Sequence, residues 1–318
     1  MVQYVCMNSK NYETIGWGKV DGKDVEFWDA RPIFTGESVD FWDRVKLIFF
    51  PKKFLLYRYI TKALGHFSTK AHKIKEFQLF RILDVGCGTG ASVIEMKKLW
   101  GKRVEVVGVD VIPLQIDIAR ERVKEHGVWA AFHLVYGELL PFKNESFDVV
   151  YTSDVLGHVE NVPMWLGELN RVLKPGGVLA MFSESEVGKH AYVRKYLLNR
   201  GLNTDPHAQF HISLYSKQEL KKLLNESGFK IKRMYSTFWA KFLVHPDELY
   251  DALQGQKKFL LLRVLNKMLY WIKKVTHPVS TAVVELYGLI EMLTIGRWVE
   301  AQGYVVLARK LKIKNCKL

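Results

Sequence analysis

Hydrophobic positions in the middle of the chain follow two alternating periods. Apolar runs of strand length occur at residues 81–85, 104–109, 130–135, 147–151 and 178–182. Between these runs, apolar residues recur at helical spacing, as in 91–100, 113–125 and 164–173. Strands that alternate with helices are typical of a parallel sheet with helices on both faces. The pattern therefore predicts a doubly wound α/β fold.

The segment before these strands is helical and basic. Apolar and basic residues alternate at helical spacing over 43–75, with an interruption at Pro51. This predicts two basic amphipathic helices. Residues 1–40 have no clean periodicity, although tryptophans recur in and just after them (Trp17, Trp28, Trp42). We interpret this stretch as a loosely structured arm.

The last third of the chain returns to the sheet after a helical segment. Ser216 and Glu219 have the spacing of a capping box, for a helix ending near Gly228. Strands follow at 229–235 and 304–309. We therefore predict an arm with lid helices (1–78), a sheet domain (79–239 and 300–318) and a helical insertion (240–299).

Charge and cysteine content narrow the cellular context. Basic residues outnumber acidic ones, 47 to 33, for a formal net charge of +14. This attracts phosphates, nucleic acid or anionic lipid, yet it is equally typical of a merely soluble surface. The three cysteines lack disulfide or zinc spacing, and we find neither a signal-peptide pattern nor an uncharged run of about 18 residues. We expect a cytoplasmic protein.

A glycine-rich loop at 84–90 carries the first chemical signal. It follows an apolar strand and opens a helix, so backbone amides and the positive helix end converge there. Gly86, Gly88 and Gly90 allow a ligand to approach the main chain, and Cys87 between them is small. The Gly-x-Gly-x-Gly spacing argues against the dinucleotide fingerprint, and no phosphate-cradling P-loop is present.

Asp110 is the second signal. It ends the next strand, about twenty residues after the loop, where a carboxylate accepts hydrogen bonds from both hydroxyls of a ribose. Asp110 also suits a capping role for the helix near Pro113, and the two roles are compatible.

Together these segments resemble the class I S-adenosylmethionine-dependent methyltransferases. The resembling branch is the small-molecule "type 11" group, which includes quinone and sterol methylating enzymes. The resemblance implies a Rossmann-like, seven-stranded sheet whose last strand is antiparallel, with S-adenosylmethionine across the carboxyl ends of the first, second and fourth strands. The matching segments are 83–90, 107–110, 140–142, 146–150 and 171–177.

The resemblance also assigns cofactor roles. Asp84 and the three glycines, with Cys87 among them, would hold the methionine part, and Asp110 the ribose. Val111 and Ile112 would contact the adenine, while Ser153 and Asp154 would line the methionine end.

One position departs from the family pattern. The acidic residue expected four positions before Leu140 is replaced by Tyr136. Glu138 is a substitute for it, or else a solvated surface glutamate, and the sequence leaves both readings open.

Histidines supply the catalytic candidates. His158 follows the fourth strand, where the methyl acceptor should lie, and an imidazole titrates near neutral pH. His207 and His211 precede the helix capped by Ser216 and are weaker candidates. Because they lie in an apparent loop with no firm third ligand, we predict no metal.

The acceptor is the least determined feature. The sequence lacks the motifs of DNA amino- and cytosine-methylases, and it has no readable RNA-binding module. We therefore expect a methyltransferase for a small, lipid-like or anionic molecule. Residues 257–274 form a basic amphipathic helix, either a packed lid or a contact with an anionic membrane surface. An RNA methyltransferase and a non-catalytic cofactor-binding regulator are the alternatives.

Overall fold

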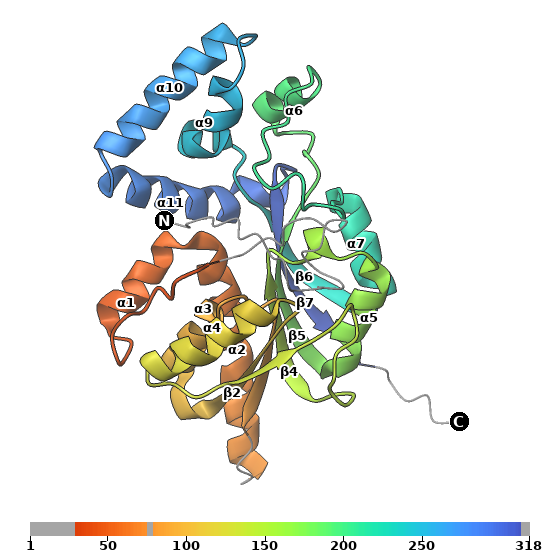
Figure 1. The fold of residues 1–318 in the computed structure, drawn as a ribbon. Helices are drawn as coiled ribbons and strands as arrows, with labels where there is room; N and C mark the ends of the chain where they lie inside the picture. Colours follow the sequence, from red (N-terminus) through yellow and green to blue (C-terminus); the bar gives the residue numbers. More distant parts are fainter. Residues whose placement is uncertain (1–28, 75–78, 313–318) are drawn as a thin grey trace.

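The computed structural model of the chain describes residues 29–74 and 79–312 (Figure 1). Most of the predicted arm, including Trp17 and Trp28, lies outside the described residues. From residue 29 to Asp40, the N-cap of α1, the described chain has no regular secondary structure.

Seven strands form one sheet in the order β3-β2-β1-β4-β5-β7-β6. β7 lies antiparallel between β5 and β6, and the pairs among β1 to β5 are parallel. This confirms the predicted fold class, including the antiparallel last strand. The strands are β1 (Phe80–Val85), β2 (Val104–Asp110), β3 (Ala131–Leu134), β4 (Phe147–Ser153), β5 (Leu173–Glu184), β6 (Phe229–Ser236) and β7 (Gly303–Lys310).

Helices cover both faces of the sheet because strand side chains alternate between two apolar layers. Ile82 packs into the core with α2, α3 and α4, whereas Leu83 and Val85 pack with α5 and α7. These helices are α2 (Pro51–Ile74), α3 (Ala91–Trp100), α4 (Pro113–Glu125), α5 (Val162–Val172) and α7 (Lys217–Glu226). The short elements are α1 (Phe41–Lys46), η1 (Leu47–Phe49), η2 (Gly101–Arg103), η3 (Leu156–His158) and η4 (Ile295–Arg297).

Residues 174–177, whose proline and glycines are typical of a turn, lie inside a strand. Leu173 already pairs with Phe147, and the ladder resumes at Val178 opposite Val149. The intervening Lys-Pro-Gly-Gly segment therefore forms a bulge within β5. Proline and glycine are tolerated there because a bulged residue donates no ladder hydrogen bond.

The predicted insertion is helical and lies beyond one end of the sheet (Figure 1). Its α8 and α9 share a small apolar core with α6, built around Leu197, Phe242 and Leu253. None of the helices in residues 29–74 and 79–312 is long and apolar enough to cross a bilayer. The elements of this region are α6 (Tyr192–Leu198), α8 (Lys241–Val244), α9 (Pro246–Gln254), α10 (Leu260–Val275) and α11 (Val279–Leu293).

A buried carboxylate fixes helix α2 on the sheet domain. Glu95 of α3 is fully buried and accepts hydrogen bonds from the backbone of Ile33 (2.8 Å) and the hydroxyl of Tyr57 (2.6 Å). Lys53 of α2 forms an ion pair with the same carboxylate at 2.8 Å. One charge thus joins the extended segment before α1, helix α2 and helix α3. The sequence contains no motif that announces this contact.

We expect Glu95→Ala to lower the free energy of unfolding by about 3–5 kcal/mol, because the substitution leaves a half-buried ammonium and a buried hydroxyl without their partner. Urea denaturation followed by circular dichroism measures this. Glu121→Ala, at an exposed position of α4, is the control and should change the value by less than about 0.5 kcal/mol. Equal effects of the two substitutions would contradict the account.

Candidate active site

The glycine loop adopts a left-handed backbone that favours glycine. Gly86, Gly88 and Gly90 have φ angles of 75°, 52° and 83°. A Cβ atom on Gly86 would lie 2.1 Å from Cγ2 of Val155. The loop therefore packs directly against the segment that follows β4, so the first and fourth strands meet at one edge of the sheet.

Asp110 holds this loop in place from the neighbouring strand. Its Oδ2 accepts a hydrogen bond from the Gly88 amide at 2.8 Å, and its Oδ1 accepts one from the Ile112 amide at 3.0 Å. Burial raises the pKa of Asp110 to about 6. The carboxylate does not cap the first turn of α4, because the Ile112 amide precedes that turn. Each oxygen keeps further lone pairs for a ligand.

Asp84 is a buried carboxyl next to the loop. Its Oδ2 is buried and has no hydrogen-bond partner among residues 29–74 and 79–312, and burial, with Asp110 and Glu95 nearby, raises the pKa of Asp84 well above the usual range. A buried acceptor without a partner is costly unless a ligand donates to it. The glycine cradle and this oxygen therefore fit the amino-acid end of S-adenosylmethionine.

The other predicted cofactor residues lie around this edge. Val111 is buried, and Ile112 packs partly buried against the same core. Ser153 donates a hydrogen bond from its hydroxyl to Asp154, which has a φ of 60°. Glu138 accepts a hydrogen bond from the amide of Asn161 at 3.1 Å, so it supports the start of α5.

Residues of the motifs at 140–142 and 171–177 hold the loop after β3 in place. Arg171 donates to Glu168 at 2.6 Å and to the carbonyls of Leu140 and Phe142. Glu168 also accepts from the Leu140 amide at 2.9 Å. This bidentate pair fixes the loop after β3 against α5.

A cavity lined by charged side chains, called the polar cavity below, adjoins the carboxyl ends of β4 and β5. Its volume is about 490 Å³. Three basic and five acidic side chains line it, so it is polar with an acidic excess. These charged residues are Lys52, Arg194, Lys241, Asp154, Glu184, Asp205, Asp247 and Glu248.

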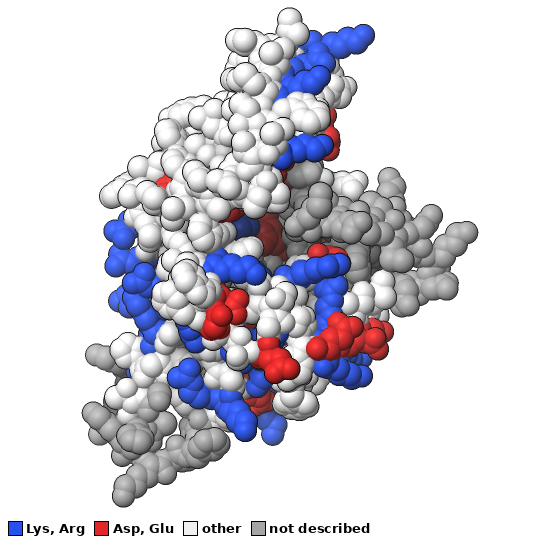
Figure 2. All heavy atoms as spheres, turned by 90° about the vertical axis from the view of Figure 1, so that its left-hand side faces the viewer, with Lys and Arg blue, Asp and Glu red and all other residues white. Residues whose placement is uncertain are grey.

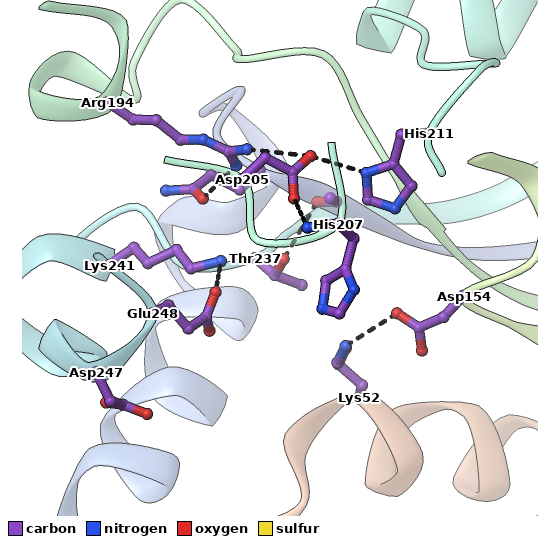
Figure 3. Close-up of polar contacts among 12 residues, drawn as sticks. Lys52, Asp154, Arg194, Asp205, His207, His211, Thr237, Lys241, Asp247 and Glu248 are labelled. Carbon is purple, nitrogen blue, oxygen red and sulfur yellow. Dashed lines mark hydrogen bonds and ion pairs between the residues drawn. The ribbon is translucent and has the colours of Figure 1, made fainter. Parts of the chain in front are cut away.

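Helix α2 contributes the central cation of this cavity. Lys52 lies 3.5 Å from Asp154 (Figure 3). It also lies 3.7 Å from the ring centroid of Phe182. Burial favours a raised pKa for Asp154, but Lys52 and the neighbouring hydrogen bonds outweigh it and lower the pKa. Burial and the charge of Asp154 raise the pKa of Glu184 well above its usual range.

The cavity brings together the three predicted histidines. His158 on η3, His207 and His211 all line it. Nδ1 of His158 lies 3.0 Å from the Phe210 carbonyl, and Nδ1 of His211 lies 2.8 Å from Asp205 Oδ2. Figure 3 shows Arg194 and His211 both directed at Asp205. Whether His158 acts in catalysis stays a prediction.

Sequence reasoning missed Glu184. It ends β5 without any motif around it, yet its Oε2 is buried and receives no hydrogen bond from the part of the chain that the structure describes. Atoms of Glu184, His158 and His211 that are able to bind a metal all lie within 4.8 Å of one another. The prediction of no metal rested on a missing third ligand, and Glu184 removes that reason.

Comparison with known proteins decides the family. A family model described as "Methyltransferase domain" matches residues 83–181. A demethylmenaquinone methyltransferase of Tropheryma whipplei (strain Twist) is 32% identical over 189 residues, covering 55% of this chain and 74% of that protein. The chain belongs to the class I S-adenosylmethionine-dependent methyltransferases. It is therefore an enzyme that uses S-adenosylmethionine as its methyl donor.

Two further proteins are similar to parts of this methyltransferase. A ubiquinone biosynthesis O-methyltransferase of Chelativorans sp. (strain BNC1) is 32% identical over 115 residues, covering 36% of this chain and 44% of that one. A solved structure of a putative sarcosine dimethylglycine methyltransferase from Galdieria sulphuraria has a TM-score of 0.45 at 19% identity. It covers 79% of this chain and 86% of that one.

We expect the methyltransferase to lose cofactor affinity in acid. A carboxylate with a pKa of about 6 is ionised above pH 7 and becomes protonated below pH 6, where it accepts fewer hydrogen bonds from ribose hydroxyls. The Kd for S-adenosylmethionine, measured by calorimetry, should rise about tenfold per pH unit below 6.

The matched variant is Asp110→Asn, which should bind more weakly at pH 8 and lose this pH dependence. Circular dichroism at each pH checks that the fold is intact. A wild-type Kd that stays constant from pH 8 to pH 5 would contradict the assignment.

Proposed function

We propose that this methyltransferase acts on a small, neutral, hydroxyl-bearing ring of the quinol type that carries an apolar tail. The observation that carries the proposal is a series of three neighbouring cavities that share lining residues. The polar cavity shares Arg194 and Gln302 with an apolar one of about 270 Å³, which in turn shares Tyr192 and Val193 with a third of about 620 Å³.

The chemistry changes along this series. The first cavity, at the strand ends, is lined by charged groups and histidines. The second is lined largely by side chains such as Trp239, Phe242 and Leu249, and the third ends at the first turn of α10. A polar ring with an apolar tail satisfies both environments, because burying a polar group among apolar side chains is costly.

The similar proteins favour the same acceptor class, since the two relatives named above act, by their names, in menaquinone and ubiquinone methylation. Among the described residues that line the polar cavity, three cations face five carboxyl groups, so no basic excess is left to bind an anionic acceptor or an RNA phosphate backbone. No comparison supports the RNA methyltransferase or the non-catalytic regulator.

The cofactor proposal follows the sequence prediction. Asp84, with the backbone of the glycine loop (Gly86, Cys87, Gly88, Gly90), would hold the methionine part. Asp110 would bind the ribose, and Val111 and Ile112 would contact the adenine. Glu138, Ser153 and Asp154 complete the proposed set.

The bound cofactor supplies an electrophilic methyl group on its sulfonium, so the protein mainly aligns the acceptor and excludes water. We propose that His158 assists the loss of the acceptor's hydroxyl proton. Nδ1 of His158 lies against the Phe210 carbonyl, so Nδ1 carries the ring proton. The lone pair of the neutral imidazole is therefore on Nε2. Lys52 would orient the ring through its charge.

Filling the apolar cavity should harm binding of the tail only. We expect Val193→Trp to raise the KM for a quinol with a short isoprenoid tail by about 10- to 200-fold. The KM for the tailless quinol and the Kd for S-adenosylmethionine should stay within about twofold. Methyl transfer from labelled cofactor measures both acceptors.

Gln218→Trp is the control, since Gln218 lies exposed on α7 and lines none of the three cavities. Equal loss for tailed and tailless quinols would remove the tail assignment. Failure of all hydroxylated rings as acceptors, with cofactor binding intact, would remove the acceptor class.

We further propose that the insertion contacts an anionic lipid surface. Apolar side chains on α10 and α11 are unusually exposed, including Leu261 (80%), Val275 (76%) and Val279 (69%). The upper part of the space-filling view is a broad uncharged surface with basic side chains along one edge (Figure 2). Lys257, Lys258, Lys267 and Lys274 are exposed before and along α10.

The exposed apolar surface of α10 begins beside the third cavity. The third cavity is lined by Leu260, Leu261 and Leu262 at the start of α10. An apolar tail would therefore enter from the lipid without crossing water. Exposed apolar patches combined with basic residues are typical of interfacial helices.

Vesicle sedimentation tests the lipid contact. The wild-type chain should bind vesicles containing phosphatidylglycerol more strongly than vesicles of phosphatidylcholine alone, and less strongly in high salt. Leu261→Glu combined with Val275→Glu should lower binding at least about tenfold, because the variant loses two exposed apolar side chains that would become buried in the lipid.

The control adds the same charge elsewhere, as Gln218→Glu with Asn225→Glu on exposed positions of α7. Equal losses in both double variants would indicate a general charge effect and contradict this surface.

A further inference from the structure

One wall of the polar cavity has the composition of a cation site. His158, Glu184 and His211 come from η3, the end of β5 and the segment before α7, which are distant in sequence. Their candidate ligand atoms lie within 4.8 Å of one another. We propose that these three residues bind a divalent transition-metal cation such as Zn²⁺.

The distances suit a site that closes slightly on its ion. For three atoms no more than 4.8 Å apart, some point lies within about 2.8 Å of all of them. Zinc bonds to imidazole nitrogen and carboxylate oxygen are about 2.0–2.2 Å long. Shifts of at most about 0.6–0.8 Å in each side chain bring the ligands to bonding distance.

Both histidines have the outer contacts that metal ligands require. Nδ1 of His158 lies 3.0 Å from the Phe210 carbonyl, and Nδ1 of His211 lies 2.8 Å from the Asp205 carboxylate. In each case Nδ1 is the donor, so the lone pair of the neutral ring lies on Nε2. A carboxylate or carbonyl that accepts from the other ring nitrogen is the usual support of a metal-bound histidine.

The carboxylate of Asp205, which contacts His211, is itself held in place by an ion pair. Asp205 forms an ion pair with Arg194 at 3.4 Å, and both side chains are largely buried. Burial opposes ionisation of Asp205, but His211 and Arg194 outweigh it and lower its pKa. An anchored carboxylate holds the ring in one orientation, which favours binding of a cation before substrate arrives.

Glu184 completes the set. Its Oε2 is buried and no hydrogen-bond donor of the described residues reaches it, while the carboxyl group lies against that of Asp154, which is paired with Lys52. A cation supplies the partner that this oxygen lacks. Two histidines and one carboxylate leave coordination positions open, which is the pattern of catalytic rather than structural metal sites.

The role of the ion rests on the proposed acceptor cavity. A cation at this wall would act as a Lewis acid that lowers the pKa of an acceptor hydroxyl. The hydroxyl proton leaves to water, the oxygen gains the methyl group, and the sulfonium sulfur keeps the electron pair of the broken bond. His158 would then assist proton loss as a metal ligand.

Calorimetric titration of Zn²⁺ into the full-length, chelator-treated chain tests the site without any acceptor. We expect one Zn²⁺ per chain, and Co²⁺ should give the visible absorption of a site with few ligands. His158→Ala, His211→Ala and Glu184→Gln should each lower the affinity at least tenfold. Asp205→Asn should lower it about 10- to 100-fold through His211.

His66→Ala, at an exposed position of α2, is the control and should bind as the wild type does. Wild-type affinity in the three ligand variants, with circular dichroism unchanged, would overturn the proposal, as would the absence of stoichiometric binding. Binding of S-adenosylmethionine is measured in the same samples. Its loss in the wild type would count against the proposed function rather than against the metal site.

Discussion

The ionised carboxylate of Glu95, buried between α2 and α3, is the contact on which the rest of the site depends. Lys53 and Tyr57 bind it from one helix, and the adjacent residue Lys52 thereby reaches Asp154 in the polar cavity. A buried charge tolerates little displacement, because each partner it loses leaves a costly polar group behind. Helix α2 thus covers one face of the sheet and also supplies Lys52 to the polar cavity.

The sheet provides the second constraint. Parallel strands end at the same edge, so the glycine loop after β1, Asp110 at the end of β2 and the Asp154 loop after β4 converge without long connections. Contact of Gly86 with Val155 and the bond from Gly88 to Asp110 make these loops one rigid unit. A preorganised unit of this kind spends little of the cofactor's binding energy on ordering the protein.

Features that depend on local chemistry were predictable from the sequence, and those that depend on distant partners were not. The strand, glycine loop and helix around Gly88 follow from local patterns, as does the placement of Asp110. Glu95 and Glu184 look like ordinary helix and strand-end residues in the sequence, and only the folded chain gives them their partners. The bulge at 174–177 also depends on the folded sheet, because proline and glycine in a sequence are typical of turns as well as of bulges.

The most direct test of the central claim is methyl transfer from labelled S-adenosylmethionine to a total lipid extract and, separately, to total RNA. The account predicts that the label enters an apolar, hydroxyl-bearing ring compound that chromatography and mass spectrometry identify, with one added methyl group. Label found in RNA alone, or in no compound although the chain binds S-adenosylmethionine, would contradict it.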